Sequence, residues 1–197
     1  MILAPPTIPE PDLRASQPTL VAAARAIAAS RDSMVNRWAD WLGDRITSSK
    51  IIPRVVIERE LGLLVDTLGG LIGPLRREVR PVWRRVTEHY GRIGAARGLA
   101  AGEIVEEMQY LRELLIRHLA PVLAAMRPRQ GMALFLRLNS LVDTGVAMAV
   151  VGYTDALAAT LLTSEDSAPN GMEVDPDEVG RQLEAFEGEL GKLALRV

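Results

Sequence analysis

Residues 98–119 read GLAAGEIVEEMQYLRELLIRHL, with apolar side chains at the spacing of one helical face. An α-helix turns by about 100° per residue, so residues three and four apart share a side. The segment therefore predicts an amphipathic helix from Gly98 to about Met126, with a kink at Pro121. The apolar side of this helix holds Ile104, Val105, Met108, Leu111, Leu115, Ile116, Leu119, Val122 and Leu123.

The same periodicity continues on both sides of this segment. Residues 18–47 have helical spacing with a break near Ser30, and a second helix starts at about Pro53 and ends at Gly69, Gly70 and Gly73. A third helix opens around Pro81 and ends near Gly98, and a fifth runs from about 130 to 163. No stretch shows sustained strand-like alternation, so the sequence predicts an all-α fold of about five helices plus a C-terminal helix.

Composition narrows the class of protein further. The chain has 197 residues, 48% of them hydrophobic, which is enough for a sizeable core. It has no cysteine, so disulfides and thiolate chemistry are excluded and a cytoplasmic location is expected. The net charge of −2 argues against a nucleic-acid-binding protein. The longest apolar window, 141–162, is interrupted by Asp143 and Asp155, so we expect no membrane span.

Four segments follow from the composition along the chain: a Pro-rich arm (1–17), a helical domain (18–163), an acidic linker (164–177) and a C-terminal helix (178–197). The apolar residues of the last segment are spaced by four and three, as in a coiled-coil heptad. We expect this helix to pair with a second copy of the chain, in a homodimer. The alternative is that it folds back on the domain. The heptad positions are Val179, Leu183, Phe186, Leu190, Leu193 and Val197.

Catalytic and metal motifs are missing from the sequence. A di-iron site needs Glu-x-x-His, but Val86 and Leu115 stand three residues before His89 and His118. Zinc motifs, a P-loop and a Gly-x-Ser-x-Gly turn are also missing. Both histidines fall at the edge of their apolar faces, where a hydrogen-bonded histidine is more typical than a haem ligand. We therefore expect no catalytic residue, no metal and no cofactor.

Charged residues on the helices leave two features to explain. The segment 76–97 is rich in arginine, and it predicts either a solvated basic face or a surface for an acidic partner. Arg112 lies about 40° from the centre of the predicted apolar arc, so it must reach solvent, pair, or face a ligand cavity. Its candidate partners are Asn139 and Asp143 on the following helix. The residues considered for a ligand or signal pocket are Arg112, His118, His89, Asn139 and Asp143.

A family resemblance rests on one motif: Arg97-Gly98, then Glu103-Ile104-Val105-x-Glu107, then Leu111-Arg112. It resembles the signature of the N-terminal sensor domain of RsbT co-antagonist (RsbRD-type) proteins, which is also found ahead of histidine kinases. In that family a histidine often lies in the preceding helix, as His89 does here. Looser similarity extends from Arg31 to Ala156.

This resemblance implies a globin-like or antiparallel-bundle sensory domain, typically dimeric and without haem. Such a domain passes a signal to an output partner, namely a kinase, a STAS domain or an anti-sigma component, in stress sigma-factor or histidine-kinase pathways. The expected mechanism is a repacking of the bundle that shifts paired C-terminal helices. The alternative is a carrier or sensor of an apolar ligand or haem-like cofactor, with Arg112 or His118 as the polar group of its cavity.

Overall fold

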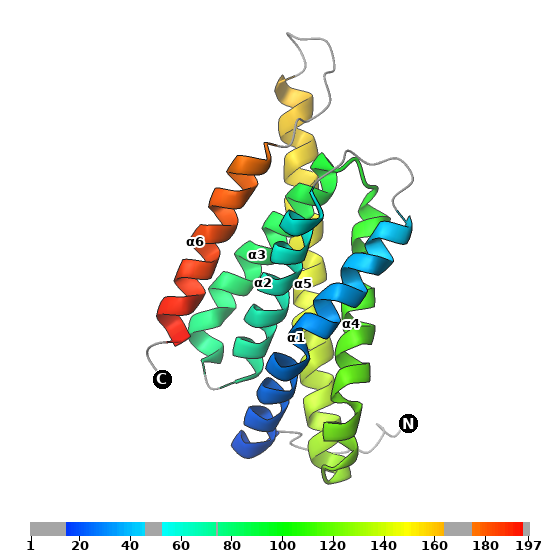
Figure 1. Ribbon diagram of the computed structural model, residues 1–197, viewed down its shortest axis with the longest axis vertical. Coiled ribbons are helices and arrows are strands. Elements are labelled where there is room, and N and C mark those ends of the chain that lie inside the picture. Colours follow the sequence, from blue (N-terminus) through cyan, green and yellow to red (C-terminus); the bar gives the residue numbers. More distant parts are fainter. Residues whose placement is uncertain (1–14, 46–52, 74, 164–174, 195–197) are drawn as a thin grey trace, which may run out of the picture.

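The computed structural model describes residues 15–45, 53–73, 75–163 and 175–194, and every regular element in them is an α-helix (Figure 1). The prediction of an all-α helical bundle is confirmed, whereas the globin-like variant of it stays a prediction. The six helices are α1 (Gln17–Arg45), α2 (Arg54–Ile72), α3 (Arg76–Ala96), α4 (Ala101–Ala124), α5 (Pro128–Thr163) and α6 (Pro176–Ala194).

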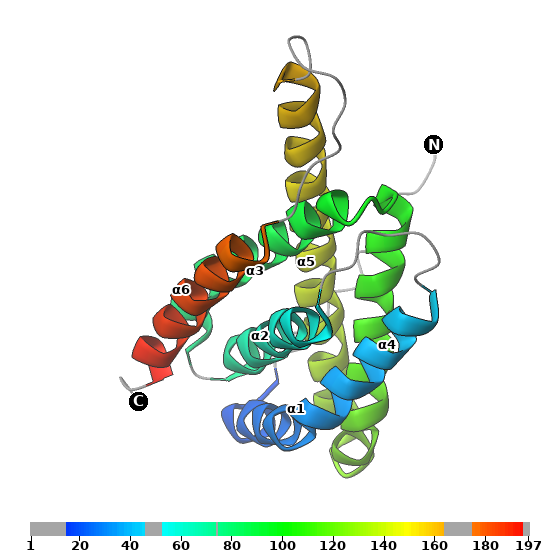
Figure 2. The same ribbon diagram turned by 45° about the horizontal axis from the view of Figure 1, so that its top comes forward.

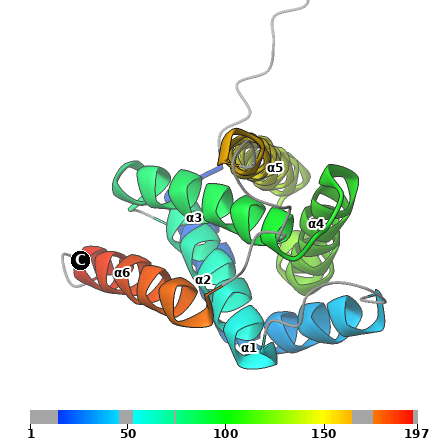
Figure 3. The same cartoon turned by 90° about the horizontal axis from the view of Figure 1, so that it is seen from above.

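The first five helices form the body of the bundle, and α6 lies on its outside. Helix α3 packs most extensively against α5, α1 packs against α2 and α4, and α4 also packs against α5. Figure 2 shows α6 alongside α2 and α3, and Figure 3 shows α5 nearly end-on, away from α6. Helix α6 therefore contacts the bundle through α2 and α3.

Two glycines allow α3 and α5 to meet backbone to backbone. A Cβ atom on Gly91 would lie 1.8 Å from the carbonyl oxygen of Ala149, and one on Gly152 would lie 1.9 Å from that of Glu88. Both distances are far below van der Waals contact, so any side chain at these positions would force the helices apart. This close crossing fixes α3 against α5, and α3 also supplies most of the charged groups described below.

The apolar stripes expected from the sequence face this core. Leu61, Leu64, Leu68 and Leu71 of α2 are fully buried, and Trp83 of α3 is 1% exposed. The helix predicted to break near Ser30 is continuous from Gln17 to Arg45. Helix α2 also continues through Gly69 and Gly70 to Ile72, because tertiary contacts override the weak helix preference of glycine.

Helix α5 is the longest helix, and much of its C-terminal part is exposed. Its C-terminal end projects beyond the ends of the other helices in Figure 1, and Leu161 and Leu162 near this end are 73% and 80% exposed. Residues 128–162 are long and apolar enough to cross a membrane by length and composition alone, although buried core helices also pass this test. Only 17% of the most apolar window is buried, so a cytoplasmic location stays a prediction.

The predicted segment boundaries are only partly covered by the described residues. Most of the Pro-rich arm (1–17) and of the acidic linker (164–177) lies outside them, as does Val197. The described part of the C-terminal segment, 178–194, belongs to α6, which packs on α2 and α3 of the same chain.

Candidate functional site

The turn between α3 and α4 brings an arginine and a glutamate together inside the protein. Helix α3 ends at Ala96, and Gly98 has a φ of 82°, a left-handed conformation that glycine adopts without strain. The chain reverses there, and the side chain of Glu103 accepts a hydrogen bond from the backbone N–H of Ala100 at 2.7 Å, which caps the start of α4. Arg97 consequently points back along α4 towards Glu107.

Arg97, Glu107 and Tyr90 form a hydrogen-bonded network that is closed to solvent. The guanidinium of Arg97 donates two parallel hydrogen bonds to the Glu107 carboxylate, at 3.0 and 3.1 Å, and the Tyr90 hydroxyl donates to the same carboxylate. Arg97, Glu107 and Tyr90 are only 3%, 4% and 2% exposed. The bidentate geometry is the strong form of an arginine–carboxylate pair, and it compensates for removing both charges from water.

The electrostatics of this network favour a charged Arg97 and a neutral Tyr90. Burial raises the pKa of Tyr90 well above its ordinary value of 10.0, and the negative charge of Glu107 raises it further. Burial by itself would lower the pKa of Arg97, but Glu107 beside it more than compensates and the net pKa is raised. The tyrosine therefore acts as a hydrogen-bond donor that stays protonated.

A second buried pair lies next to this network and directly under α6. The Nδ1 atom of His89 lies 3.1 Å from Oε1 of Glu60, and both side chains are 4% exposed. The His89 ring packs edge-on against Phe186 of α6, with 5.7 Å between the ring centroids. Its Nε2 atom is buried without a hydrogen-bond partner among the described residues. The charge of Glu60 also acts on Tyr90, which links the two groups electrostatically. We call Glu60, His89, Tyr90, Arg97 and Glu107 the buried cluster.

Helix α6 covers His89 of the buried cluster with its heptad stripe. Val179 and Leu183 are 5% and 0% exposed, and Phe186, Leu190 and Leu193 pack against the core of the same chain. The preferred prediction, that this stripe pairs with a second copy, is therefore not what the single chain shows. The stripe is covered by α2 and α3, as in the alternative of a helix folded back on the domain, because these helices present a complementary apolar surface.

Salt bridges at the surface accompany this apolar contact. Arg59 of α2 donates two hydrogen bonds to Glu187 at 2.6 and 2.7 Å, and Arg85 of α3 contacts Glu189 at 2.6 Å. At Arg85, the arginine-rich segment 76–97 is therefore paired with an acidic residue of the same chain, and a surface for an acidic partner stays a prediction.

Of the other predicted pocket residues, Asn139 and Asp143 line the same depression between α3 and α5, whereas Arg112 and His118 do not line it. Arg112 pairs with Asp143 of α5 and is 29% exposed, so the predicted partner Asp143 is confirmed at the margin of the core. The Asn139 side chain donates instead to the carbonyl of Phe135 in its own helix, at 2.9 Å. His118 donates from Nδ1 to the Leu114 carbonyl at 2.8 Å, as expected for a boundary histidine.

Two of the expectations for charged side chains are wrong. Glu107 lies outside the apolar side predicted for its helix, but it is only 4% exposed, because the buried face of α4 is rotated towards Glu107 and away from Arg112. The cause is the pairing of Glu107 with Arg97 and Tyr90, which makes a polar residue suitable for the core. His89 was expected at an edge, but α6 covers it. Both Arg97 and Glu107 belong to the motif that carries the family resemblance. That motif is the feature of the sequence from which this cluster could have been predicted.

The buried cluster does not provide the acidic and histidine ligands of a metal site. Within the part of the chain that the structure describes, no group of three or more His, Asp or Glu side chains could hold a metal ion. The one carboxylate of the network, Glu107, is already engaged by three donors. The arrangement is suited to holding helices in one packing rather than to exchanging protons with a substrate.

Comparisons with known proteins provide no relative for this chain: no protein-family model, no curated protein and no solved structure matches it. The function must therefore be inferred from the chain's own geometry.

Proposed function

We propose that this chain is a non-catalytic sensory or regulatory domain, in which the packing of the buried cluster is relayed to α6. The observation that carries this proposal is the contact of Phe186 with His89, because it joins the outermost helix directly to a buried polar group. Helix α6 thereby becomes the output element. This is consistent with the resemblance to RsbRD-type sensor domains, which act through partners in stress sigma-factor or histidine-kinase pathways.

The contacts of α6 suit a helix that can leave the bundle. Only Val179 and Leu183 are fully covered, and the ion pairs of Arg59 and Arg85 lie at the surface, where each contributes about 0–1 kcal/mol. The core helices are held by much larger buried surfaces. Local opening of α6 therefore requires less free energy than unfolding of the bundle, which is the property of elements that move in signalling.

Release of α6 would expose a heptad stripe that can pair with another helix. The proposed active form is accordingly a homodimer or a complex with a protein output partner, reached by exchange of α6 between two discrete packings. Neither nucleic acid nor a membrane is part of this mechanism, and we place it in the cytoplasm. Light scattering of the full chain should give a dimer mass, and a monomer mass under all conditions would overturn the homodimer.

Hydrogen exchange of the backbone amides tests the relay. We expect Glu60→Gln to speed exchange in α6 while α4 is unchanged, because the weakened bond to His89 lets its ring shift under Phe186. Glu58→Gln is the matched control on the same helix, since Glu58 pairs with Arg54 at the surface. Equal exchange rates in α6 for both variants, or opening of α6 only together with α2 and α3, would contradict the relay.

A second function is favoured by a different observation. A cavity of about 280 Å³ lies under the C-terminal end of α6 and is lined mainly by apolar residues, including Ile27, Val79 and Leu190. Its size and lining suit a small apolar ligand that would compete with or reinforce α6 docking. The predicted polar groups, Arg112 and His118, do not line it, but Asp66 does, paired with Arg31. Native mass spectrometry of the purified protein should reveal such a ligand.

A further inference from the structure

A groove lies between α3 and the first half of α5, away from α6. One part of it has a volume of about 830 Å³ and an adjoining part about 490 Å³. The two parts share Arg76, Leu136, Ser140 and Leu141, so they form one continuous depression. Volumes of this order are typical of sites for small molecules.

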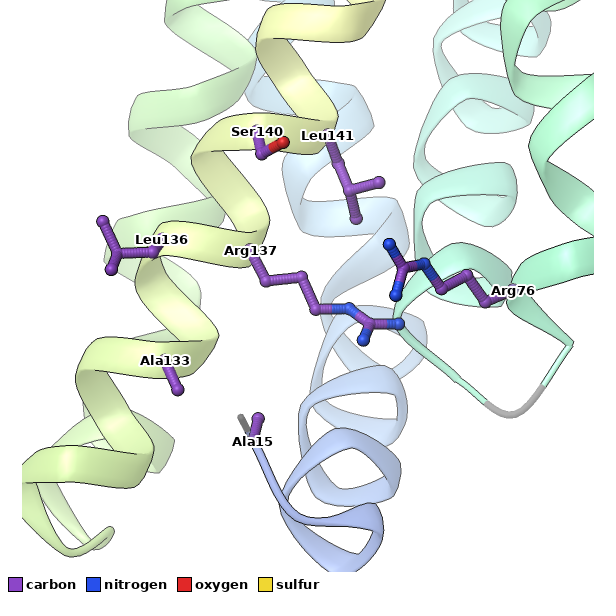
Figure 4. A pocket seen from close by; sticks show the side chains of 7 residues that line it. All are labelled: Ala15, Arg76, Ala133, Leu136, Arg137, Ser140 and Leu141. Atoms are coloured by element: carbon purple, nitrogen blue, oxygen red, sulfur yellow. The ribbon is translucent and has the colours of Figure 1, made fainter. Parts of the chain in front are cut away.

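Four arginines line this depression, which we call the arginine groove. Arg76, Arg80 and Arg84 are spaced by four residues on α3 and so share one face of the helix, and Arg137 faces them from α5. Figure 4 shows the Arg137 and Arg76 side chains extending into the space between the two helices. Within the described residues, none of the four forms an ion pair with a carboxylate, whereas Arg85 and Arg92 of the same helix each do.

The guanidinium of Arg137 makes one hydrogen bond to the backbone, and part of it has no partner among the described residues. Its Nη2 atom donates to the carbonyl of Leu71 at 3.0 Å, near the C-terminus of α2, where a positive charge is favourable. Its Nε atom is buried and has no partner among the described residues. Burial lowers the pKa of Arg137, and the charges of Arg76 and Arg80 lower it further. The groove therefore concentrates positive charge that no described side chain neutralises.

Apart from Asn139 and Asp143, the rest of the lining is apolar or hydroxyl-bearing. Leu136 is 48% exposed at the groove, and Leu141 and Met148 line the same wall. Ser140 adds a hydroxyl beside Arg137, as Figure 4 shows. Asp143 is the acidic residue of the lining, and Arg112 already pairs with it. A ligand that fits must therefore combine a concentrated negative charge with a small apolar body.

Nucleic acid and membrane surfaces fit this groove less well. Base stacking needs an exposed aromatic ring, but Trp83, the aromatic residue of the lining, is 1% exposed and donates its indole N–H to the Leu141 carbonyl at 3.1 Å. A membrane headgroup layer is contacted by a convex face, whereas these arginines line a depression. Guanidinium groups match the geometry of phosphate oxygens, and several of them together favour a dianion over a single carboxylate.

We propose that the arginine groove is a binding site for a soluble phosphate monoester with a small apolar group, held by Arg76, Arg80 and Arg137. The phosphate lies among the guanidinium groups near the N-terminus of α3, and the apolar group lies against Leu136 and Leu141. This site is independent of the proposed role of α6, because the groove is formed by α3 and α5 and shares no residue with the buried cluster.

Calorimetric titration at low ionic strength tests this site, with phenyl phosphate as the probe and phenol as its uncharged counterpart. We expect saturable binding of one phenyl phosphate per chain and no binding of phenol. Arg80→Ala should weaken binding at least fivefold, and Arg76→Ala with Arg80→Ala should abolish it. Both residues are exposed, so these variants should fold like the parent chain. The matched control is Arg37→Ala, which removes an exposed arginine from α1 and should leave binding unchanged.

NMR spectroscopy of the tryptophan indole N–H groups shows where the probe binds, because Trp83 lines the groove. The observed quantity is the position of the Trp83 N–H resonance. It should shift on addition of phenyl phosphate, while those of Trp38 and Trp41, outside the groove, stay in place. Equal weakening by Arg80→Ala and Arg37→Ala, equal binding of phenyl phosphate and phenol, or no shift at Trp83 would each overturn the proposal. So would binding to vesicles that contain an anionic phospholipid without any binding of soluble phenyl phosphate, since the ligand would then be a lipid headgroup.

Discussion

The buried cluster and the arginine groove both depend on α3, yet they treat charge in opposite ways. In the cluster, Arg97 and Glu107 are almost fully buried and satisfy each other with two hydrogen bonds. In the groove, Arg76 and Arg80 are exposed, and neither meets a carboxylate in the described part of the chain. Charges that serve the fold must be paired because burial is costly, whereas charges left unpaired at a surface remain available to a ligand.

The largest expected effect comes from breaking the pair inside the buried cluster. Glu107→Ala leaves Arg97 buried without a counter-charge, which should reduce the free energy of unfolding by about 3–5 kcal/mol. Urea denaturation measures this loss. Glu106→Ala is the matched control, because Glu106 is 52% exposed and pairs with Arg45 at the surface. It should cost at most about 1 kcal/mol. Similar losses for the two variants would mean that the cluster is not a special feature of the fold.

The second prediction concerns the helix that covers His89. Leu183 of α6 is fully buried against the bundle, so Leu183→Ala should lower the free energy of α6 opening by about 2–3 kcal/mol. This loss of free energy is in the lower part of the range measured for replacing buried leucines with alanine. The reason is that α6 can open without the other helices. Hydrogen exchange of the α6 amides measures it. Leu161→Ala removes the same atoms from a 73% exposed position and should leave α6 exchange unchanged.

The third prediction concerns the contribution of the Tyr90 hydroxyl to stability, separately from that of the Arg97–Glu107 ion pair. Tyr90→Phe removes one hydrogen bond to Glu107 and should cost about 1 kcal/mol at neutral pH. The pKa of Tyr90 is higher in the folded than in the unfolded chain, so above about pH 10 only the unfolded chain loses this proton. The stabilisation is therefore complete below pH 10 and is lost as the pH rises further. Urea midpoints measured from about pH 8 to about pH 11 should fall less steeply for Tyr90→Phe than for the parent chain.

The smallest effect is expected in the arginine groove. Arg80→Ala should change the free energy of unfolding by no more than about 0.5 kcal/mol, and at low salt the change should be a slight stabilisation. The reason is that it removes a charge that repels Arg137 and has no carboxylate partner among the described residues. Added salt should diminish the difference, because it screens exposed charges. A large loss of stability in thermal denaturation would show that Arg80 serves the fold and not a ligand.

Sequence reasoning predicted the helices well and the charged sites poorly, and the same residues explain both outcomes. The leucines of α2 and the stripe of α3 are apolar at helical spacing, so their burial follows from periodicity. Glu107 is an acidic residue in a helix rich in glutamate, and its local pattern matches that of a solvated side chain. Its burial depends on Arg97 and Tyr90, which lie 10 and 17 residues away in the chain.

Pairing partners across helices were predictable only where few candidates existed. Asp143 was one of two polar residues expected opposite Arg112, and the structure confirms it. The contact between His89 and Phe186 spans two elements whose relative position no periodicity specifies. For α6, the heptad spacing indicates an apolar stripe but not the surface that covers it, since a second copy and the chain's own α2 and α3 both satisfy that pattern.

By itself, the sequence determined that this protein is an all-α bundle, where its helices run and which faces of them are apolar. These properties depend on side chains within a few residues of one another, so local periodicity carries them. Only the tertiary structure decided which charges are buried and paired, that α6 lies over His89, and that four arginines line one groove. Those properties depend on residues that are distant in the chain, and the packing of helices against one another brings them together.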